Sequence, residues 1–195
     1  ELRSPLNSII GFTSVLLEGM SGPLSPVQVQ QLQVVQDASR HLLEIINDML
    51  DLSKIEAGVM ALASETFDLQ QLVVRLKDRF AVLATQSGLY LRQSGEAQPC
   101  PLRGDSRRVE QVLGNLLSNA IKFTGTGGVN IGIDRGPVEV KVTVADTGPG
   151  IAEADRPRLF RRFSQLEPGE GVLAQGTGLG LAIASGLAEA MGGRI

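Results

Sequence analysis

Apolar residues recur at three- and four-residue steps through the first part of the chain, which is the period of helices that each bury one face. The turn residues Gly22 and Pro23 divide this part into two runs, so the pattern predicts a helical hairpin. Ser25 is the expected N-cap of the second helix, because Pro26 stands at the first helical position and Gln28 completes a capping box.

The second helix of this hairpin carries more apolar surface than one neighbouring helix can cover. Its apolar seam consists of Leu32, Val35, Ala38, Leu42, Ile45, Met49, Leu52 and Ile55. Since two helices alone make a poor core, we expect residues 1–60 to dimerise, so that two hairpins form a four-helix bundle.

From residue 61 onward the pattern changes to mixed helices and strands. Helices are predicted over 69–85, 105–122 and 181–191, and strands over 89–93, 129–133 and 138–145. Asp105 is the expected N-cap of the second helix, and a short turn at Gly136 and Pro137 favours an antiparallel last pair of strands. Because apolar and polar residues alternate in the strands, helices need to cover one face only. The fold class is therefore α+β, a dimerising helical hairpin followed by a two-layer α/β sandwich over 61–195.

Composition supports a globular chain, because 43% of the 195 residues are apolar and 20% are charged. The net charge of −3 gives no excess of positive charge for nucleic acid or an anionic membrane, so neither is an expected partner. No apolar run approaches the roughly 20 residues of a membrane span. The single Cys100 has no second cysteine for a disulfide or a zinc cluster, which suits a cytoplasmic location.

Both ends of the chain are expected to be cut. A helical pattern is already under way at Glu1, and residues 192–195 read as the beginning of a strand. Both predicted domains would then be truncated, with further modules expected outside the 195 residues.

The first of three candidate functional clusters lies on the predicted helix 105–122. There Asn115, Asn119 and Lys122 share one face, opposite the apolar residues. The oxygen of a neutral Asn is a ligand that Mg²⁺ accepts together with phosphate oxygens and water, and Lys122 adds a positive charge. A helix face that simply contacts water is the alternative interpretation.

The second cluster is Asp146-Thr147-Gly148-Pro149-Gly150, at the end of a predicted strand. The carboxylate of Asp146 can accept a hydrogen bond from the exocyclic amine of adenine, where guanine carries an oxygen instead. Gly148 and Gly150 let the backbone pass close to a flat ligand. An ordinary turn at a strand end is the alternative.

The third cluster is Gly176-Thr177-Gly178-Leu179-Gly180, directly before the last predicted helix. Glycine N–H groups and a helix N-terminus together can hold phosphates. The spacing matches neither the P-loop nor the dinucleotide fingerprint, so by itself this cluster is also compatible with a flexible loop.

In order and spacing, the three clusters resemble the N, G1 and G2 boxes of the Bergerat-fold (GHKL) ATPases, and in particular those of sensor histidine kinases of two-component systems. Three further stretches are similar to that family's F box, to the residues after the phosphoacceptor in its H box, and to the end of its second dimerisation helix. They are Phe160-Arg161-Arg162-Phe163, Glu1-Leu2-Arg3-Ser4-Pro5-Leu6-Asn7 and residues 45–56. The resemblance spans the whole chain and implies a dimerisation and phosphotransfer hairpin at 1–60 and an ATP-binding catalytic domain at 61–195.

The resemblance also implies the ligands ATP and Mg²⁺ and a role for each cluster. Asn119 would bind Mg²⁺, Asn115 and Lys122 would contact phosphates, Phe123 would lie near the adenine, and Asp146 would read its amine. In this family a histidine takes the γ-phosphoryl group of ATP and passes it to an aspartate of a response-regulator receiver domain. A second copy of the chain and a receiver domain are therefore the expected partners.

The phosphoacceptor histidine implied by the resemblance would stand immediately before Glu1, outside the 195 residues. Glu1 would accept its proton as a general base. Ser4 occupies the position where related kinases carry Thr or Asn to position water for dephosphorylation, so phosphatase activity is an open alternative. His41, the one histidine of the chain, lacks the following Glu-Leu-Arg context and is interpreted as structural.

The chain departs from the family pattern in the segment that corresponds to the ATP lid, residues 164–180. This segment contains no Lys or Arg, and Gln175 replaces the usual first glycine of the G2 run. The γ-phosphate charge would then be met by Mg²⁺, Lys122, backbone N–H groups and Arg161 or Arg162.

Two alternative functions compete with the kinase. ATP hydrolases of the same fold carry Glu where this chain has Asn115, and because an amide cannot take a proton from water, Asn115 favours phosphotransfer. The second alternative is a catalytically weak, nucleotide-binding dimer scaffold, suggested by the lid without cations.

Overall fold

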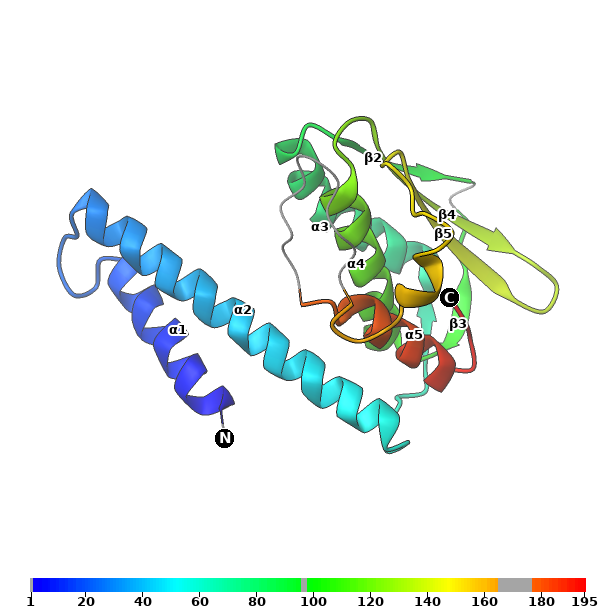
Figure 1. Ribbon diagram of the computed structural model, residues 1–195, viewed down its shortest axis with the longest axis horizontal. Coiled ribbons are helices and arrows are strands. Elements are labelled where there is room, and N and C mark those ends of the chain that lie inside the picture. Colours follow the sequence, from blue (N-terminus) through cyan, green and yellow to red (C-terminus); the bar gives the residue numbers. More distant parts are fainter. Residues whose placement is uncertain (1, 96–97, 165–176) are drawn as a thin grey trace. The chain divides into compact units, whose positions relative to one another are not determined.

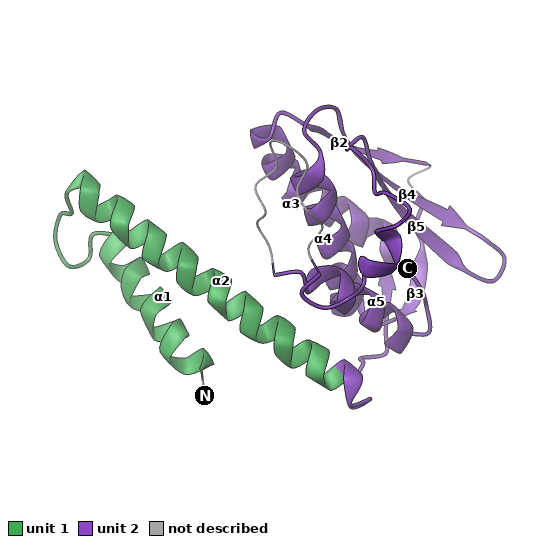
Figure 2. Ribbon diagram, viewed as in Figure 1, with its two compact units in different colours: residues 1–54 green, residues 55–195 purple. Residues whose placement is uncertain are grey.

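The chain forms two compact units, residues 1–54 and residues 55–195 (Figure 2). The structure, a computed structural model, describes residues 2–95, 98–164 and 177–195. Each unit is described on its own below.

The first unit is a hairpin of two helices, α1 (Arg3–Leu17) and α2 (Pro26–Glu56) (Figure 1). The last residues of α2 belong to the second unit (Figure 2). The predicted capping box is present at the start of α2. The Ser25 N–H donates to Gln28 Oε1 at 2.8 Å, and the Gln28 N–H donates to Ser25 Oγ at 3.3 Å. These bonds satisfy backbone groups that a helix start leaves unpaired, which explains why α2 begins here.

A buried polar contact joins the two helices of the hairpin. Gln36 of α2 is only 8% exposed, and its Nε2 donates to Ser14 Oγ of α1 at 2.8 Å. Because a buried amide without a partner is costly, this bond favours one alignment of α1 against α2.

Much of the apolar surface of the hairpin remains exposed in one copy of the chain. An open apolar groove of about 330 Å³ is lined in part by Leu2, which directly precedes α1, by Leu6 of α1, and by Leu42 and Met49 of α2. Phe12, on α1, is 72% exposed. The hairpin therefore buries only part of the apolar pattern seen in its sequence.

The second unit is a two-layer α/β sandwich, as predicted. Its helices are α3 (Leu69–Gln86), α4 (Ser106–Phe123) and α5 (Gly180–Ala190), with a short 3-10 helix over Arg156–Arg158. Its strands are β1 (Glu65–Asp68), β2 (Tyr90–Ser94), β3 (Pro101–Gly104), β4 (Gly128–Arg135) and β5 (Val140–Asp146). Strand β2 pairs in parallel with β4, β4 pairs antiparallel with β5, and β1 pairs antiparallel with β3. The three helices lie together on one side of the strands (Figure 1).

The core of this unit lies between the helices and the strands. Its fully buried side chains include Leu72, Val73 and Leu76 of α3, Leu117 of α4, and Val129 and Ile131 of β4. Alternate residues of β4 and β5 face this core, which is the pattern that predicted helices on one face.

Asp105 is the N-cap of α4, as predicted, and it also holds the chain that enters the sandwich. Its carboxylate accepts from the Arg108 N–H at 3.0 Å and from the Ala63 N–H at 2.9 Å. Burial opposes the charged form, but these bonds and the positive charge of Arg108 outweigh burial and lower the pKa of Asp105. The start of α4 is thereby fixed.

Two details of the strand prediction were wrong. Val138 is 96% exposed and precedes β5, which begins at Val140, because the Gly136 N–H donates to Glu139 O at 2.8 Å and extends the turn. The short strands β1 and β3 were not predicted, since each has four residues and they pair with each other across a long stretch of sequence.

Candidate functional site

The candidate site is built on the C-terminal half of α4. Asn115, Asn119 and Lys122 are all half-buried, so this polar helix face is not simply a solvated one. The Lys122 ammonium lies 4.7 Å from the centroid of the Phe123 ring, a cation–π contact. Burial lowers the pKa of Lys122, and a bound anion would favour its charged form.

Asn115 connects α4 to the start of α5. Its Nδ2 donates to the carbonyl oxygen of Gly180 at 3.0 Å, and Gly180 is the first residue of α5. This bond brings the first and third sequence clusters together although 65 residues separate them. It also means that the Asn115 amide presents its NH₂ group, a donor, toward the start of α5.

The Asp146 turn contacts the end of α4. Asp146 is the last residue of β5, and its Oδ1 accepts from the Gly148 N–H at 2.8 Å. Gly148 lies so close that an added Cβ would stand 2.9 Å from the Phe123 carbonyl oxygen. Gly150 has a φ of +74°, a left-handed conformation that favours glycine. The second cluster therefore adjoins the first.

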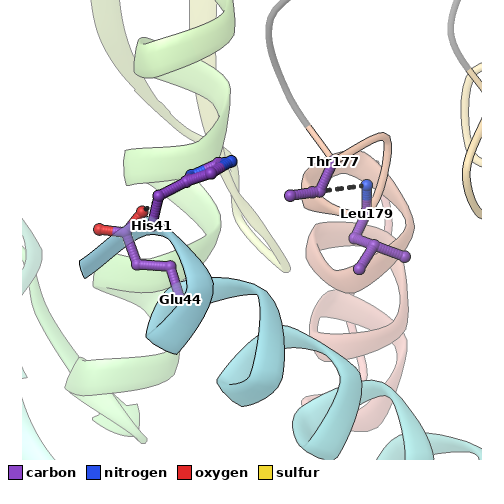
Figure 3. Close-up of polar contacts among 4 residues, drawn as sticks. All are labelled: His41, Glu44, Thr177 and Leu179. Atoms are coloured by element: carbon purple, nitrogen blue, oxygen red, sulfur yellow. Dashed lines mark hydrogen bonds and ion pairs between the residues drawn. The ribbon is translucent and has the colours of Figure 1, made fainter. Parts of the chain in front are cut away.

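The described part of the third cluster packs against the F-box stretch. Gly178 has a φ of +68°, and a Cβ there would stand 2.9 Å from Cα of Phe163. The Leu179 N–H donates to Thr177 Oγ1 at 3.2 Å (Figure 3). Leu179 is completely buried, so the side chain of this predicted cofactor-binding residue belongs to the core.

The remaining predicted residues belong to the first unit or fall outside the described part. Glu1 and Gly176 are outside the described residues, as is most of the predicted lid. Ser4 is exposed on α1. His41 is exposed on α2, where its Nδ1 lies 3.9 Å from Glu44 (Figure 3).

Arg162, one of the two F-box arginines considered for the γ-phosphate, is paired with a carboxylate. Its guanidinium forms an ion pair with Glu56 within the second unit. A phosphate would have to compete with Glu56 for this side chain.

Thr147 is a residue of this site whose role sequence reasoning missed. Its hydroxyl donates to the Thr126 carbonyl at 2.8 Å and accepts from the Gly128 N–H at 2.9 Å. The available signal was a β-branched residue with a hydroxyl between Asp146 and a glycine, but nothing in the sequence identifies its partners.

Asn119 is the predicted metal ligand of this site. Within residues 2–95, 98–164 and 177–195, no group of three His, Cys, Asp or Glu side chains is placed to hold a metal. The carbonyl oxygen of Asn119 is a hard ligand of the kind that Mg²⁺ takes one or two of, alongside phosphate oxygens and water. Asn119, half-buried on α4, is a residue of the type that fits such a metal.

This combination defines a class of protein: a GHKL-type nucleotide-binding sandwich joined to a helical hairpin. Residues 104–195 match the family described as histidine kinase-, DNA gyrase B- and HSP90-like ATPase. Residues 1–58 match the His Kinase A (phospho-acceptor) domain. The chain belongs to the sensor histidine kinases.

Curated relatives match along the whole chain. The circadian input-output histidine kinase CikA of Synechococcus elongatus is 40% identical over 200 residues, which cover 100% of this chain and 26% of CikA. The signal transduction histidine-protein kinase BarA of Escherichia coli is 38% identical over 201 residues, 100% of this chain and 22% of BarA. The chain thus spans about a quarter of the length of these relatives.

Solved structures share the fold. The structure of full-length ShkA in complex with AMPPNP has a TM-score of 0.80 and 32% identity, and the match covers 97% of this chain and 39% of that one. The Acinetobacter baumannii histidine kinase AdeS has a TM-score of 0.64 and 28% identity, with 97% and 86% covered. Among the described helices, none combines the length and the apolar character that crossing a bilayer demands.

Proposed function

We propose that this chain is the core of an ATP-dependent protein histidine kinase. It would move the γ-phosphoryl group of Mg-ATP to a histidine immediately before Glu1, and from there to an aspartate of a response regulator. In the first step a histidine nitrogen attacks the γ-phosphorus, the bond from phosphorus to the bridging oxygen breaks, and ADP leaves. Glu1 would take the proton of the histidine.

The observation that carries the proposal is that position 115 holds an amide, Asn115, whose NH₂ group is hydrogen-bonded. An ATP hydrolase of this fold needs a carboxylate here to activate water, whereas Asn115 is an amide whose Nδ2 is engaged with Gly180 O at 3.0 Å. An amide cannot act as a general base at neutral pH. With no base for water at this position, transfer to a positioned nucleophile is favoured over hydrolysis.

We assign roles to the site residues from the family resemblance, and the contacts that join them around the end of α4 support the assignment. Asp146 would read the adenine amine, with Phe123 against the base. Asn115 and Lys122 would contact the phosphates, and Asn119 would hold Mg²⁺, which supplies charge neutralisation when bound. The backbone of Gly148, Gly150 and 176–180 would line the nucleotide.

Lys122 is the cation to which we assign the terminal phosphates. The AMPPNP in the ShkA structure is an ATP analogue, which supports the choice of nucleotide. Because Arg162 is paired with Glu56, Lys122 is better placed to meet phosphate charge.

Restoring a histidine before Glu1 tests the proposed reaction. With γ-labelled ATP and Mg²⁺, the extended chain is expected to acquire a label that is lost in acid and retained in base, as for a phosphorylated histidine. The same chain with alanine at the added position should stay unlabelled, and a His41→Ala change should leave the label intact. The measurement is protein-bound radioactivity after gel separation.

Two results would contradict this proposal. Free phosphate released without labelled protein would favour the hydrolase alternative. Nucleotide binding without either product would favour the dimer scaffold.

The exposed apolar face of the hairpin supports a homodimer. Leu2, which directly precedes α1, is 65% exposed, and Phe12 of α1 is 72% exposed. A second hairpin would cover such residues in a four-helix bundle. The proposed partners are therefore a second copy of this chain and a response-regulator receiver domain.

Light scattering on the whole chain is expected to give a mass of twice the chain's 20.7 kDa. Leu42→Glu, which puts a charge into the apolar groove, should shift the mass toward one chain because the buried carboxylate would lack a partner. Gln30→Glu puts the same charge at an exposed polar position of α2 and should leave the dimer intact. A folded, monomeric parent chain would contradict the dimer.

Two further features of the proposal depend on the kinase reaction. Ser4, exposed on α1, occupies the position where related kinases carry Thr or Asn to position water, so we propose phosphatase activity toward the receiver as a secondary activity. Because the reaction uses ATP and a receiver domain, we expect the chain to work in the cytoplasm.

A further inference from the structure

Thr147 occupies a position that links the two sides of the candidate adenine site. It directly follows Asp146, and it contacts the loop 124–128, which connects the end of α4 to β4. We propose that Thr147 is a positioning residue that holds the Asp146 carboxylate against the end of α4, and so determines how strongly the site prefers adenine. This inference rests on the proposed function, in which Asp146 reads the base.

Three hydrogen bonds fix Thr147 to the loop. Its hydroxyl donates to the Thr126 carbonyl at 2.8 Å and accepts from the Gly128 N–H at 2.9 Å. Its own N–H donates to the Gly128 carbonyl at 3.1 Å. Both hydrogen-bonding functions of the hydroxyl are thus used, and both backbone groups of Gly128 are paired with Thr147.

The loop is shaped to receive this hydroxyl. Gly127 has a φ of +93°, and a Cβ at Gly127 would overlap the Thr147 hydroxyl. The Gly127 carbonyl also accepts from the Tyr90 N–H at 3.1 Å, which ties the same loop to β2. A side chain at position 127 would therefore displace Thr147 or break the loop conformation.

The loop is in turn attached firmly to α4. Thr124, 5% exposed, donates from its Oγ1 to the Ala120 carbonyl at 2.6 Å. From Thr124 to Thr126 the chain is too short to absorb a large movement. Because Thr147 is bound to this loop, the neighbouring Asp146 is held in a fixed position relative to Lys122 and Phe123.

The turn after Asp146 also contacts the end of α4 through its next residue, Gly148. Asp146 Oδ1 accepts from the Gly148 N–H, and Gly148 lies against the Phe123 carbonyl. Thr147 therefore sits between two contacts that both join the Asp146 turn to the end of α4. Losing the hydroxyl would loosen the carboxylate and leave the phosphate-facing residues of α4 in position.

Thr147→Val removes the hydroxyl and keeps the β-branched shape. The bonds lost lie within the protein, so they weaken binding only as far as ATP must order the loosened turn; with one net hydrogen bond worth about 0.5–1.5 kcal/mol, ATP affinity is expected to fall by up to about tenfold. GTP affinity should change less, because guanine gains little from the Asp146 carboxylate. Thr147→Ser should restore the preference for ATP, and Thr143→Val, an exposed threonine of β5, should leave it unchanged.

The experiment measures the affinities for ATP and GTP by competition against a fluorescent ATP analogue in the presence of Mg²⁺. It compares the parent chain with Thr147→Val, Thr147→Ser, Asp146→Asn and the double variant that combines Thr147→Val with Asp146→Asn. The positioning role predicts that Thr147→Val has little additional effect once the carboxylate is gone. Equal losses for ATP and GTP, or multiplying effects in the double variant, would overturn it and leave Thr147 as a turn-stabilising residue. If Asp146→Asn leaves the ATP affinity unchanged, the proposed role of Asp146 as the base reader is wrong. If Asp146→Asn lowers the ATP affinity and Thr147→Val does not, only the positioning role of Thr147 is wrong.

Discussion

Asp146→Asn is expected to weaken ATP binding by about ten- to hundredfold. The substitution keeps the shape of the side chain and removes the anionic acceptor for the adenine amine. A hydrogen bond to a charged group is worth roughly 1.5–3 kcal/mol, which corresponds to that change in affinity.

The turn formed by Asp146 and Gly148 prevents the introduced amide from replacing the lost hydrogen bond to adenine. The Gly148 N–H donates to Asp146 Oδ1 at 2.8 Å, and an introduced amide would keep that bond with its oxygen. Its NH₂ would then face the adenine amine, and two donors cannot pair. GTP carries an oxygen at the same ring position, so the preference for ATP over GTP should also fall.

Titration calorimetry of the parent chain and the variant with Mg-ATP and Mg-GTP measures the effect. Asp134→Asn is the matched control, since it makes the same change at an exposed position of β4. Unchanged ATP affinity in Asp146→Asn would remove Asp146 from the site.

The elements with local signals were predictable from the sequence. The capping box of Ser25 and Gln28 and the Asp105 N-cap fix the starts of α2 and α4 through contacts within a few residues. The alternation in β4 and β5 reports which face is buried. Signals of this kind need no knowledge of distant parts of the chain, so the sandwich and its last antiparallel pair were predicted correctly.

Long-range contacts explain what the sequence could not provide. The strands β1 and β3 are each four residues long and gain their identity from pairing with each other. The parallel pairing of β2 with β4 likewise depends on α3 and α4 packing on one face.

The candidate site likewise has features that could be predicted from the sequence and features that depend on long-range packing. The residue types of Asn115, Asn119, Lys122 and Asp146 carry chemistry that can be recognised in sequence. The bond from Asn115 to Gly180, the contact of Gly148 with Phe123 and the burial of Leu179 depend on how α4, α5 and β5 pack. Leu179 illustrates this best, because a residue within a glycine-rich cluster proves to be part of the core.

Gly148→Ala is expected to have the second large effect. The added Cβ would stand 2.7 Å from Asp146 Oδ1 and 2.9 Å from the Phe123 carbonyl oxygen, both well inside van der Waals contact. The φ of Gly148 is outside the left-handed region, so alanine meets no backbone penalty and the effect is steric. Overpacking of this kind costs about 1–3 kcal/mol.

Relief of this clash determines the effect on function. The Phe123 carbonyl belongs to the end of α4 and cannot move alone, whereas the Asp146 side chain can rotate away. Rotation would take the carboxylate from the position in which it reads adenine, so ATP affinity should fall about tenfold or more while the chain remains folded. Calorimetry with Mg-ATP and thermal unfolding measure the two effects separately.

Gly125→Ala provides the matched control for this prediction. Gly125 lies in the loop after α4, a Cβ there would meet no atom within 4 Å, and its φ is outside the left-handed region. This variant should bind ATP and unfold like the parent chain. If Gly148→Ala also binds ATP with parental affinity, the close contact of the Asp146 turn with α4 does not form part of the nucleotide site, because a carboxylate displaced by that methyl group could not still be reading the base.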